Sequence, residues 1–232
     1  MKVKRAVWGL LALTMVLAWA SQGALAASRE DAAIKVKEAE LVLEQIMTSH
    51  DRSIPSDLMK TAKAVAIFPN MVKAGFIIGG QYGTGLVMVR RAGGGFGPPA
   101  FFSMGGVSAG FQIGAQATDL ILVVAKQRGL DGLLKNKVKF GADLAVVAGP
   151  VGRRGEAGLS GASLQADVLS YSRSKGLFAG VSLEGAGIEF DKETTSNYYG
   201  KALTMADFMA PGKVMAPPEA QSLIKTLDKA GR

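Results

Sequence analysis

Glycine is unusually dense in the middle of this chain, and that density limits what the chain can fold into. Of the 30 glycines in the 232 residues, 25 lie between Gly75 and Gly187. Glycine weakens a helix, whereas in strands it permits bulges, tight bends and the close approach of another backbone. The middle of the chain is therefore predicted to form a strongly bent β-sheet, in which glycines such as Gly79, Gly110 and Gly141 have structural roles.

Short β-branched or aromatic runs alternate with these glycines. Many short strands separated by glycine turns are typical of an antiparallel sheet that curls into a sandwich or barrel. The glycine-rich segment 79–85 is predicted to be a turn between two strands, and segment 93–99 a flexible loop. The predicted strands lie at residues 65–68, 76–78, 86–89, 100–104, 120–124, 144–147, 168–171 and 177–183.

Helical patterns lie on both sides of this region. Residues 28–48 carry apolar side chains at three- and four-residue steps, and Ser28 is a candidate N-cap. Further helices are predicted at 55–62, at 127–135, after a capping box that begins at Thr204, and at 219–229. The fold class is therefore α+β: a glycine-rich, curled antiparallel β-sheet or barrel flanked by N-terminal and C-terminal helices.

The first 26 residues have the three parts of a secretory signal. Lys2, Lys4 and Arg5 precede an uncharged apolar run at 6–20, and Ala24-Leu25-Ala26 supplies the small residues of a cleavage site. The apolar run is short for a membrane span of ~20 residues, although an uncleaved anchor is the alternative. We expect a signal peptide at 1–26, a folded domain at 27–210, a C-terminal helical tail at 211–232, and a periplasmic or secreted protein.

Residue usage argues against most enzyme classes. The absence of cysteine and the presence of one histidine exclude thiolate or multi-histidine metal sites and cysteine nucleophiles. Segment 106–110 matches a Gly-x-Ser-x-Gly nucleophile elbow, but His50 precedes Ser108, which reverses the expected order. We predict no catalytic residue, cofactor or metal. The acidic residues Glu184, Glu189, Asp191 and Glu193 are more typical of a solvated strand end than of a calcium site.

Positive charge is unevenly distributed along this chain of net charge +8. No acidic residue occurs from Leu58 to Thr118. A basic surface attracts anionic lipid, while nucleic acid is not expected for an exported chain that lacks a recognised nucleic-acid motif. A basic face that only contacts solvent is the alternative. The candidate lipid-binding residues are Lys60, Lys63, Lys73, Arg90, Arg91, Lys135, Lys137, Arg153 and Arg154.

An ordered series of motifs runs through the chain. It begins with Ala-Val-Ala-Ile-Phe-Pro at 64–69, continues through the glycine-rich segments at 79–85, 108–114 and 148–152, and ends with Asn-Tyr-Tyr-Gly at 197–200. This series resembles the SYLF domain family over roughly residues 33–208. The resemblance implies a non-enzymatic, lipid-binding SYLF-type domain at 27–210. Eukaryotic members, in endocytic adaptor proteins, bind phosphoinositides, and some bind and bundle actin.

Export changes which of these properties are expected here. An exported chain would not meet actin or cytosolic phosphoinositides in its own cell, so we expect the fold and a general affinity for anionic or amphiphilic lipid at a membrane surface. The alternative is a structural envelope protein that binds a protein partner through its β-sheet. A small outer-membrane barrel is disfavoured, because residues 120–124 and 144–147 lack the alternation of a lipid-facing wall.

Overall fold

The computed structural model describes residues 27–48, 54–75, 78–109, 114–150, 162–174, 177–180, 183 and 185–231. The predicted signal peptide, His50, Gly110, Arg153, Arg154 and Glu184 lie outside these residues.

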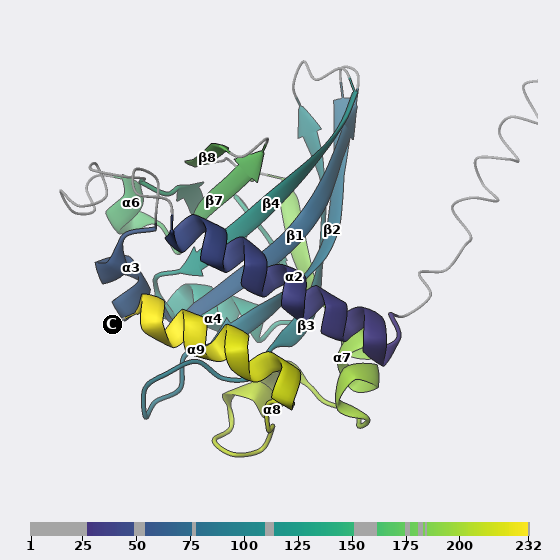
Figure 1. The fold of residues 1–232 in the computed structure, drawn as a ribbon. Coiled ribbons are helices and arrows are strands. Elements are labelled where there is room, and N and C mark those ends of the chain that lie inside the picture. The colour runs from purple at the N-terminus through teal and green to yellow at the C-terminus, as the bar shows by residue number, and fades with distance from the viewer. Residues whose placement is uncertain are drawn as a thin grey trace, which may run out of the picture.

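The described chain has an α+β architecture in which helices cover a curled sheet (Figure 1). The helices are α2 (Arg29–Met47), α3 (Ser56–Thr61), α4 (Gln127–Leu133), α6 (Ala162–Gln165), α7 (Lys192–Tyr199), α8 (Met205–Met209) and α9 (Gln221–Ala230), with a 3-10 turn η1 at Pro218–Ala220. The strands are β1 (Ala64–Gly75), β2 (Ile78–Val89), β3 (Ala100–Ala109), β4 (Gly114–Val124), β5 (Lys137–Lys139), β6 (Val146–Ala148), β7 (Val168–Ser174), β8 (Leu177–Gly180) and β9 (Ala186–Phe190).

These strands form one sheet in the order β5-β9-β3-β2-β1-β4-β7-β6, and β8 also pairs with β7. The sheet curls into a half-barrel, which confirms the predicted α+β class and curvature. The sheet is mixed rather than wholly antiparallel, because β6 runs parallel to β7. The chain between these two strands includes α6 and is long enough for the crossover that parallel pairing needs.

The central strand β1 bends at a bulge after Phe68. Its register shifts there against both neighbours, β2 and β4. Asn70 adopts a left-handed backbone with φ 52°, which asparagine tolerates better than most residues. Its backbone N–H donates to a carboxylate oxygen of Asp119 on β4 at 3.0 Å, and its side-chain amide donates to Glu38 on α2 at 3.4 Å. The bulge is thus held from two sides.

Strand β2 continues without interruption through residues 79–85, which were predicted to be a glycine turn. The prediction at 79–85 was wrong because these glycines serve close packing within the strand rather than a reversal of the chain. A Cβ at Gly85 would lie 2.3 Å from the carbonyl oxygen of Ile67, and one at Gly83 would lie 2.6 Å from the Met71 side chain. Glycine allows β2 to follow the bulge of β1 closely.

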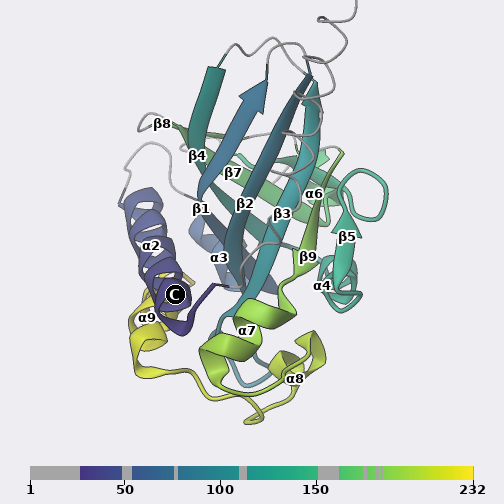
Figure 2. The ribbon, with the colours of Figure 1, turned by 90° about the vertical axis from the view of Figure 1, so that its right-hand side faces the viewer.

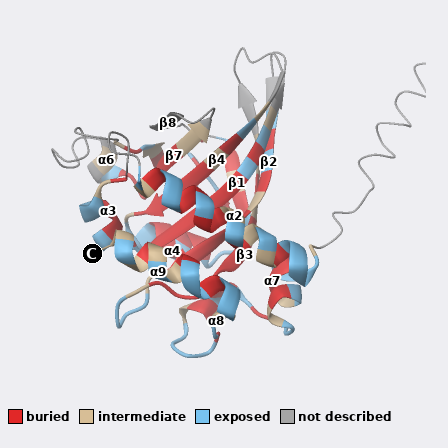
Figure 3. Cartoon of the chain, in the orientation of Figure 1, coloured by how far each residue is buried: buried red, intermediate tan, exposed pale blue. Residues whose placement is uncertain are grey.

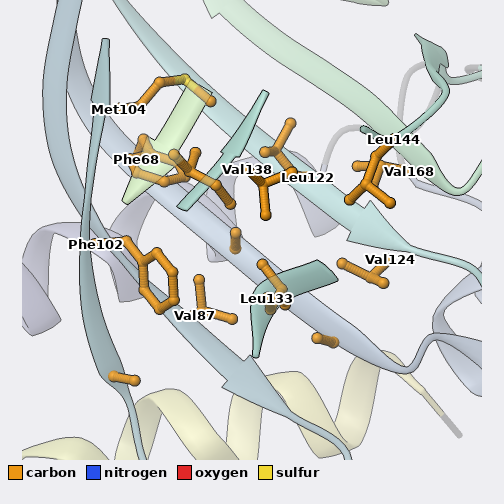
Figure 4. Packing of buried hydrophobic residues seen from close by; sticks show 14 of the residues in the cluster. Phe68, Val87, Phe102, Met104, Leu122, Val124, Leu133, Val138, Leu144 and Val168 are labelled. Carbon is orange, nitrogen blue, oxygen red and sulfur yellow. The ribbon is translucent and has the colours of Figure 1, made fainter. Parts of the chain in front are cut away.

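Two hydrophobic layers cover the two faces of the sheet. On the outer face, α2 and α9 bury residues such as Leu43 and Leu223 against Ile67. On the inner face, one cluster draws residues from strands at both edges of the sheet, since the sheet wraps around it. Figure 4 shows Phe68, Phe102 and Leu122 turned toward this interior. Figure 3 shows buried residues along the strands and exposed ones on the outward sides of the helices.

The C-terminal helix is part of the outer layer. Leu223 and Leu227 of α9 are fully buried beside α2. A buried carboxylate joins the two helices, because Glu40 of α2 accepts hydrogen bonds from Lys37 at 2.8 Å and from the Ser222 hydroxyl of α9. Burial by itself raises the pKa of Glu40, but these two hydrogen bonds outweigh it and hold the pKa below its ordinary value. The predicted tail therefore packs as a structural element.

Glycine 85 gives a direct test of the close approach between β1 and β2. Gly85→Ala should lower the free energy of unfolding by ~3 kcal/mol, since the added methyl group meets backbone atoms that cannot move aside cheaply. Gly80→Ala, in the same strand, is the matched control because nothing lies within 4 Å of its Cβ position. Chemical denaturation of both variants measures the difference, and equal stabilities would contradict the packing role.

Candidate functional site

A groove at one end of the half-barrel brings together three of the predicted basic residues. Its volume is about 780 Å³. Its lining includes Lys63, Arg90 and Arg91, which we call the basic wall, and the largely buried Phe208 and Val214 with Met209, which we call the apolar wall. We call this hollow the basal groove. Two of the segments that line it, the β2–β3 connection and the segment after α8, project from the lower end of the molecule in Figures 1 and 2.

The β2–β3 connection is an ordered turn and not the flexible loop that its glycines suggested. Arg91 N–H donates to the carbonyl oxygen of Gly95 at 2.9 Å, and Gly94 N–H donates back to Arg91 at 3.0 Å. Gly94 and Gly95 have φ values of 89° and 71°, which glycine adopts freely. Phe96 is buried, and its N–H donates at 2.7 Å to a carboxylate oxygen of Asp228 on α9.

The far end of this connection is held by α7. The Tyr199 hydroxyl donates to the carbonyl oxygen of Pro99 at 2.8 Å, and Phe101 N–H donates to the Thr195 hydroxyl at 3.2 Å. Burial raises the pKa of Tyr199, so that this hydroxyl stays protonated and remains a donor. The connection that carries Arg91 is therefore held by two of the C-terminal helices, α7 and α9.

Arg90 and Arg91 have different roles although they are adjacent. The Arg90 guanidinium donates to the carbonyl oxygens of Ala62 at 2.8 Å and Met59 at the end of α3, and it stacks 4.3 Å from the centre of the Phe96 ring. Arg90 thus satisfies the last carbonyls of a helix and packs on a buried ring. Arg91 is exposed on the groove wall.

Lys63 and Arg91 are the cations that the groove offers to a ligand. Both are exposed, and neither forms an ion pair within the part of the chain that the structure describes. The Lys63 backbone is fixed between strands, since its N–H donates to Val124 and its carbonyl accepts from Arg90, both at 2.8 Å. The side chain therefore projects from a rigid base.

The other predicted basic residues lie apart from the groove wall. Lys60 pairs with Asp57 within α3 at 3.3 Å, and Lys137 of β5 pairs with Glu189 of β9 at 2.7 Å. Lys135 is exposed just before β5. Lys73 lies in β1 opposite Gln81 and Gln116, and partial burial lowers its pKa. The structure therefore brings Lys63, Arg90 and Arg91 together. The other predicted basic residues that the structure describes, Lys60, Lys73, Lys135 and Lys137, do not line the groove.

The apolar wall of the groove was missed by sequence reasoning. It comes from α8 and residues 210–214, which follow the acid-free basic stretch by about 90 positions. The one available signal was the capping box, which is present: the Thr204 N–H and hydroxyl donate to Asp207 at 2.7 and 2.8 Å. Lys213 also pairs with Asp207, which ties the following turn back to α8.

The predicted enzyme-like motif has no elbow geometry. Ser108 lies within β3, where it pairs with Gly79 of β2, rather than at a turn from strand to helix. Two acidic residues of the predicted cluster have local partners, since Glu189 pairs with Lys137 and Asp191 caps α7 by accepting from Thr194. Among the helices of the described residues, none has the length and apolar character needed to cross a membrane.

Asp207 gives a test of the turn that forms the apolar wall. Hydrogen bonds from Lys213, then from the Thr204 N–H and hydroxyl, lower the pKa of Asp207 to about 2. Because the folded-state pKa is depressed, this stabilisation is present above the ordinary carboxyl pKa of ~3.9 and is lost as the pH falls toward 2. A carboxyl-carbon NMR titration should find that low pKa, and Lys213→Met should raise it. A wild-type pKa near 4 would exclude the pairing.

The chain is similar to a known family and to several of its named members. A sequence model of the family described as "Ysc84: Las17-binding protein actin regulator" matches residues 105–230. "LAS seventeen-binding protein 3" of Saccharomyces cerevisiae is 36% identical over 180 residues, which is 77% of this chain and 39% of that protein. "SH3 domain-containing YSC84-like protein 1" of Xenopus laevis is 34% identical over 179 residues, or 77% of this chain and 53% of that protein.

The chain spans about two fifths to one half of the length of these relatives. No solved structure is significantly similar to it. The match to the family model and the sequence identity to these relatives confirm the resemblance that the motif series indicated. This chain belongs to the Ysc84 family, the family of SYLF domains.

Proposed function

We propose that this chain is an exported, non-enzymatic module that binds anionic lipid at the cell envelope. The observation that carries the proposal is the basal groove, whose lining combines the exposed cations Lys63 and Arg91 with the apolar side chains Phe208, Met209 and Val214. A lipid has both features that such a groove can contact, an anionic headgroup and an apolar body. Each basic residue near an anionic membrane contributes ~1 kcal/mol.

Separate observations support the other two parts of the proposal, which are export and a non-enzymatic function. The basic start, apolar run and Ala-x-Ala site of residues 1–26 support export. The engagement of Ser108 in strand pairing, and of Asp191 as a helix cap, leaves the enzyme-like motifs with structural roles and supports a binding function.

A protein partner is the second candidate, and one surface favours it. Val72 of β1 and Tyr82 of β2 are directly paired on the outer face of the sheet and are 52% and 56% exposed, so α2 leaves this part of the sheet uncovered. The names of the family and of the yeast relative refer to binding of Las17, which is a protein. Under this alternative, a partner would cover Val72 and Tyr82 and would not depend on Lys63 and Arg91.

Export predicts a defined mass. The protein isolated from the envelope fraction of an expressing bacterial cell should begin at Ala27, because cleavage is expected after Ala24-Leu25-Ala26. Intact-mass spectrometry measures this directly. A mass that retains residues 1–26 would contradict cleavage, and recovery only from the cytosol would contradict export.

Lipid binding predicts an effect of charge reversal in the groove. The protein should float with phosphatidylglycerol vesicles at low salt, and binding should weaken as salt shortens the Debye length toward ~8 Å. The Lys63→Glu/Arg91→Glu double variant should bind ~30-fold more weakly, as expected for the loss of two contacts of ~1 kcal/mol each.

Lys135→Glu/Lys137→Glu is the matched control, since it makes the same charge change beside β5. It should bind within about threefold of wild type. A larger loss in this control than in the groove variant would move the contact to the β5 side. Failure of the wild-type protein to float at low salt would overturn the lipid proposal and leave the protein partner as the better candidate.

A further inference from the structure

The segment between α8 and η1, residues 210–217, places an apolar side chain in solvent. We call it the basal loop. Met215 is 82% exposed, more than any other large hydrophobic residue among those that the structure describes. Six of the eight residues in this loop are alanine, proline, valine or methionine. Isolated exposed hydrophobic residues are common, so Met215 indicates a contact site only together with the charges that lie beside this loop.

The exposure of Met215 is fixed by contacts on both sides of it. Val214 is buried in the inner cluster, and the carbonyl oxygen of Ala216 accepts from the Gln221 side chain at 3.2 Å. Further back, Lys213 pairs with Asp207 and its N–H donates to the Ala210 carbonyl at 3.3 Å. Because its neighbours are anchored, Met215 cannot fold back into the core without breaking these contacts.

Hollows lie on both sides of the basal loop, and both contain cations. On one side Val214 lines the basal groove with Lys63 and Arg91. On the other side Met215 lines a second hollow of about 400 Å³, which includes Arg29 and Lys201. The exposed Met215 therefore stands between two basic hollows.

Two of the acidic residues near this end are paired with cations, and a third, Asp228, accepts the Phe96 N–H. Asp207 pairs with Lys213, and Glu219 pairs with Arg29 at 3.0 Å. Lys201, like Lys63 and Arg91, is exposed and has no ion-pair partner within the described ranges. The surface around the basal loop thus has an excess of positive charge, while its centre is apolar.

This distribution fits a bilayer better than a protein surface. An anionic bilayer offers phosphates at one depth and an apolar region a few ångströms below, which matches an exposed apolar side chain in a loop that has cations in the hollows on both sides. The β2–β3 connection and the basal loop project from the same end in two perpendicular views, so one flat surface can meet both (Figures 1 and 2).

We propose that the basal loop inserts Met215 among the lipids of an anionic bilayer while Lys63, Arg91 and Lys201 contact the phosphates. This inference rests on the proposed lipid-binding function and specifies how the protein is oriented on the membrane. In this orientation the basal end contacts the bilayer, and the outer face of the sheet with α2 and α9 does not.

The absence of cysteine makes a site-specific test simple. Met215→Cys, labelled with an environment-sensitive NBD fluorophore, should shift its emission to the blue and gain intensity on phosphatidylglycerol vesicles. Lipids that carry a quencher high on the acyl chain should quench it. The matched control is Val72→Cys, which is also exposed and lies eight residues along β1 from the groove end, a separation of ~26 Å. This control should show neither effect.

A second pair of variants tests the energetic role without a label. Met215→Asp should lower vesicle affinity about tenfold or more, whereas Met215→Leu should stay within about twofold of wild type. Neither change touches the core, because the side chain is exposed.

The outcomes separate the two proposals. If the wild-type protein floats but NBD at position 215 stays unchanged and Met215→Asp binds normally, the insertion is overturned while lipid binding stands. If the wild-type protein does not float at low salt, lipid binding itself falls, and the insertion with it. A blue shift at position 72 instead of 215 would place the membrane on the uncovered sheet face and would also overturn this orientation.

Discussion

The bulge in β1 sets the curvature on which both hydrophobic layers depend. A central strand that stayed regular would leave a flatter sheet, with one face too open to enclose a cluster. Here the two register shifts around Asn70 bend β1, and the inner cluster then gathers residues from both sheet edges. Strand β2 can follow the bend because it has glycine at positions 83 and 85, where a Cβ would meet the Met71 side chain and the Ile67 carbonyl oxygen of β1, respectively.

The same bend couples the sheet to its helices. Asp119 of β4 and Glu38 of α2 both accept from Asn70, so that the bulge, the neighbouring strand and the covering helix are held in one arrangement. Helix α2 in turn buries Glu40 against Ser222 of α9, and α9 holds the β2–β3 connection through Asp228. A continuous set of contacts therefore runs from the bulge to the wall of the basal groove, which explains how a glycine-rich connection can present Arg91 in a fixed position.

The sequence was most informative where a pattern was local. The periodicity of residues 28–48 and the capping box at Thr204 correspond to α2 and α8, and the density of glycine indicated a bent sheet. Local reasoning failed where glycine has a tertiary role. Gly83 and Gly85 resemble turn residues in isolation, and only the position of Ile67 and Met71 shows that they lie within a strand. The glycines at 93–95 indicated flexibility, because the contacts that hold the following residues Phe96 and Pro99 come from Asp228 and Tyr199, which are at least 100 positions later.

The charged residues of the candidate site also show that local sequence patterns do not reveal tertiary contacts. Clustering along the chain selected Lys60, Lys63, Arg90 and Arg91 with equal weight, since a sequence does not show which cations already have partners. Side chains of adjacent residues at the end of a strand point in opposite directions. Arg90 therefore turns toward Phe96 and the carbonyl oxygens of α3, and Arg91 turns toward solvent. A charge reversal at Arg90 would remove hydrogen bonds that hold α3, so a loss of lipid binding in that variant would follow from misfolding as readily as from a lost contact. Arg91 and Lys63 have no ion-pair partner among the described residues, so their charges can be reversed with little disturbance of the fold, and the proposed membrane contact is therefore best tested at these two residues.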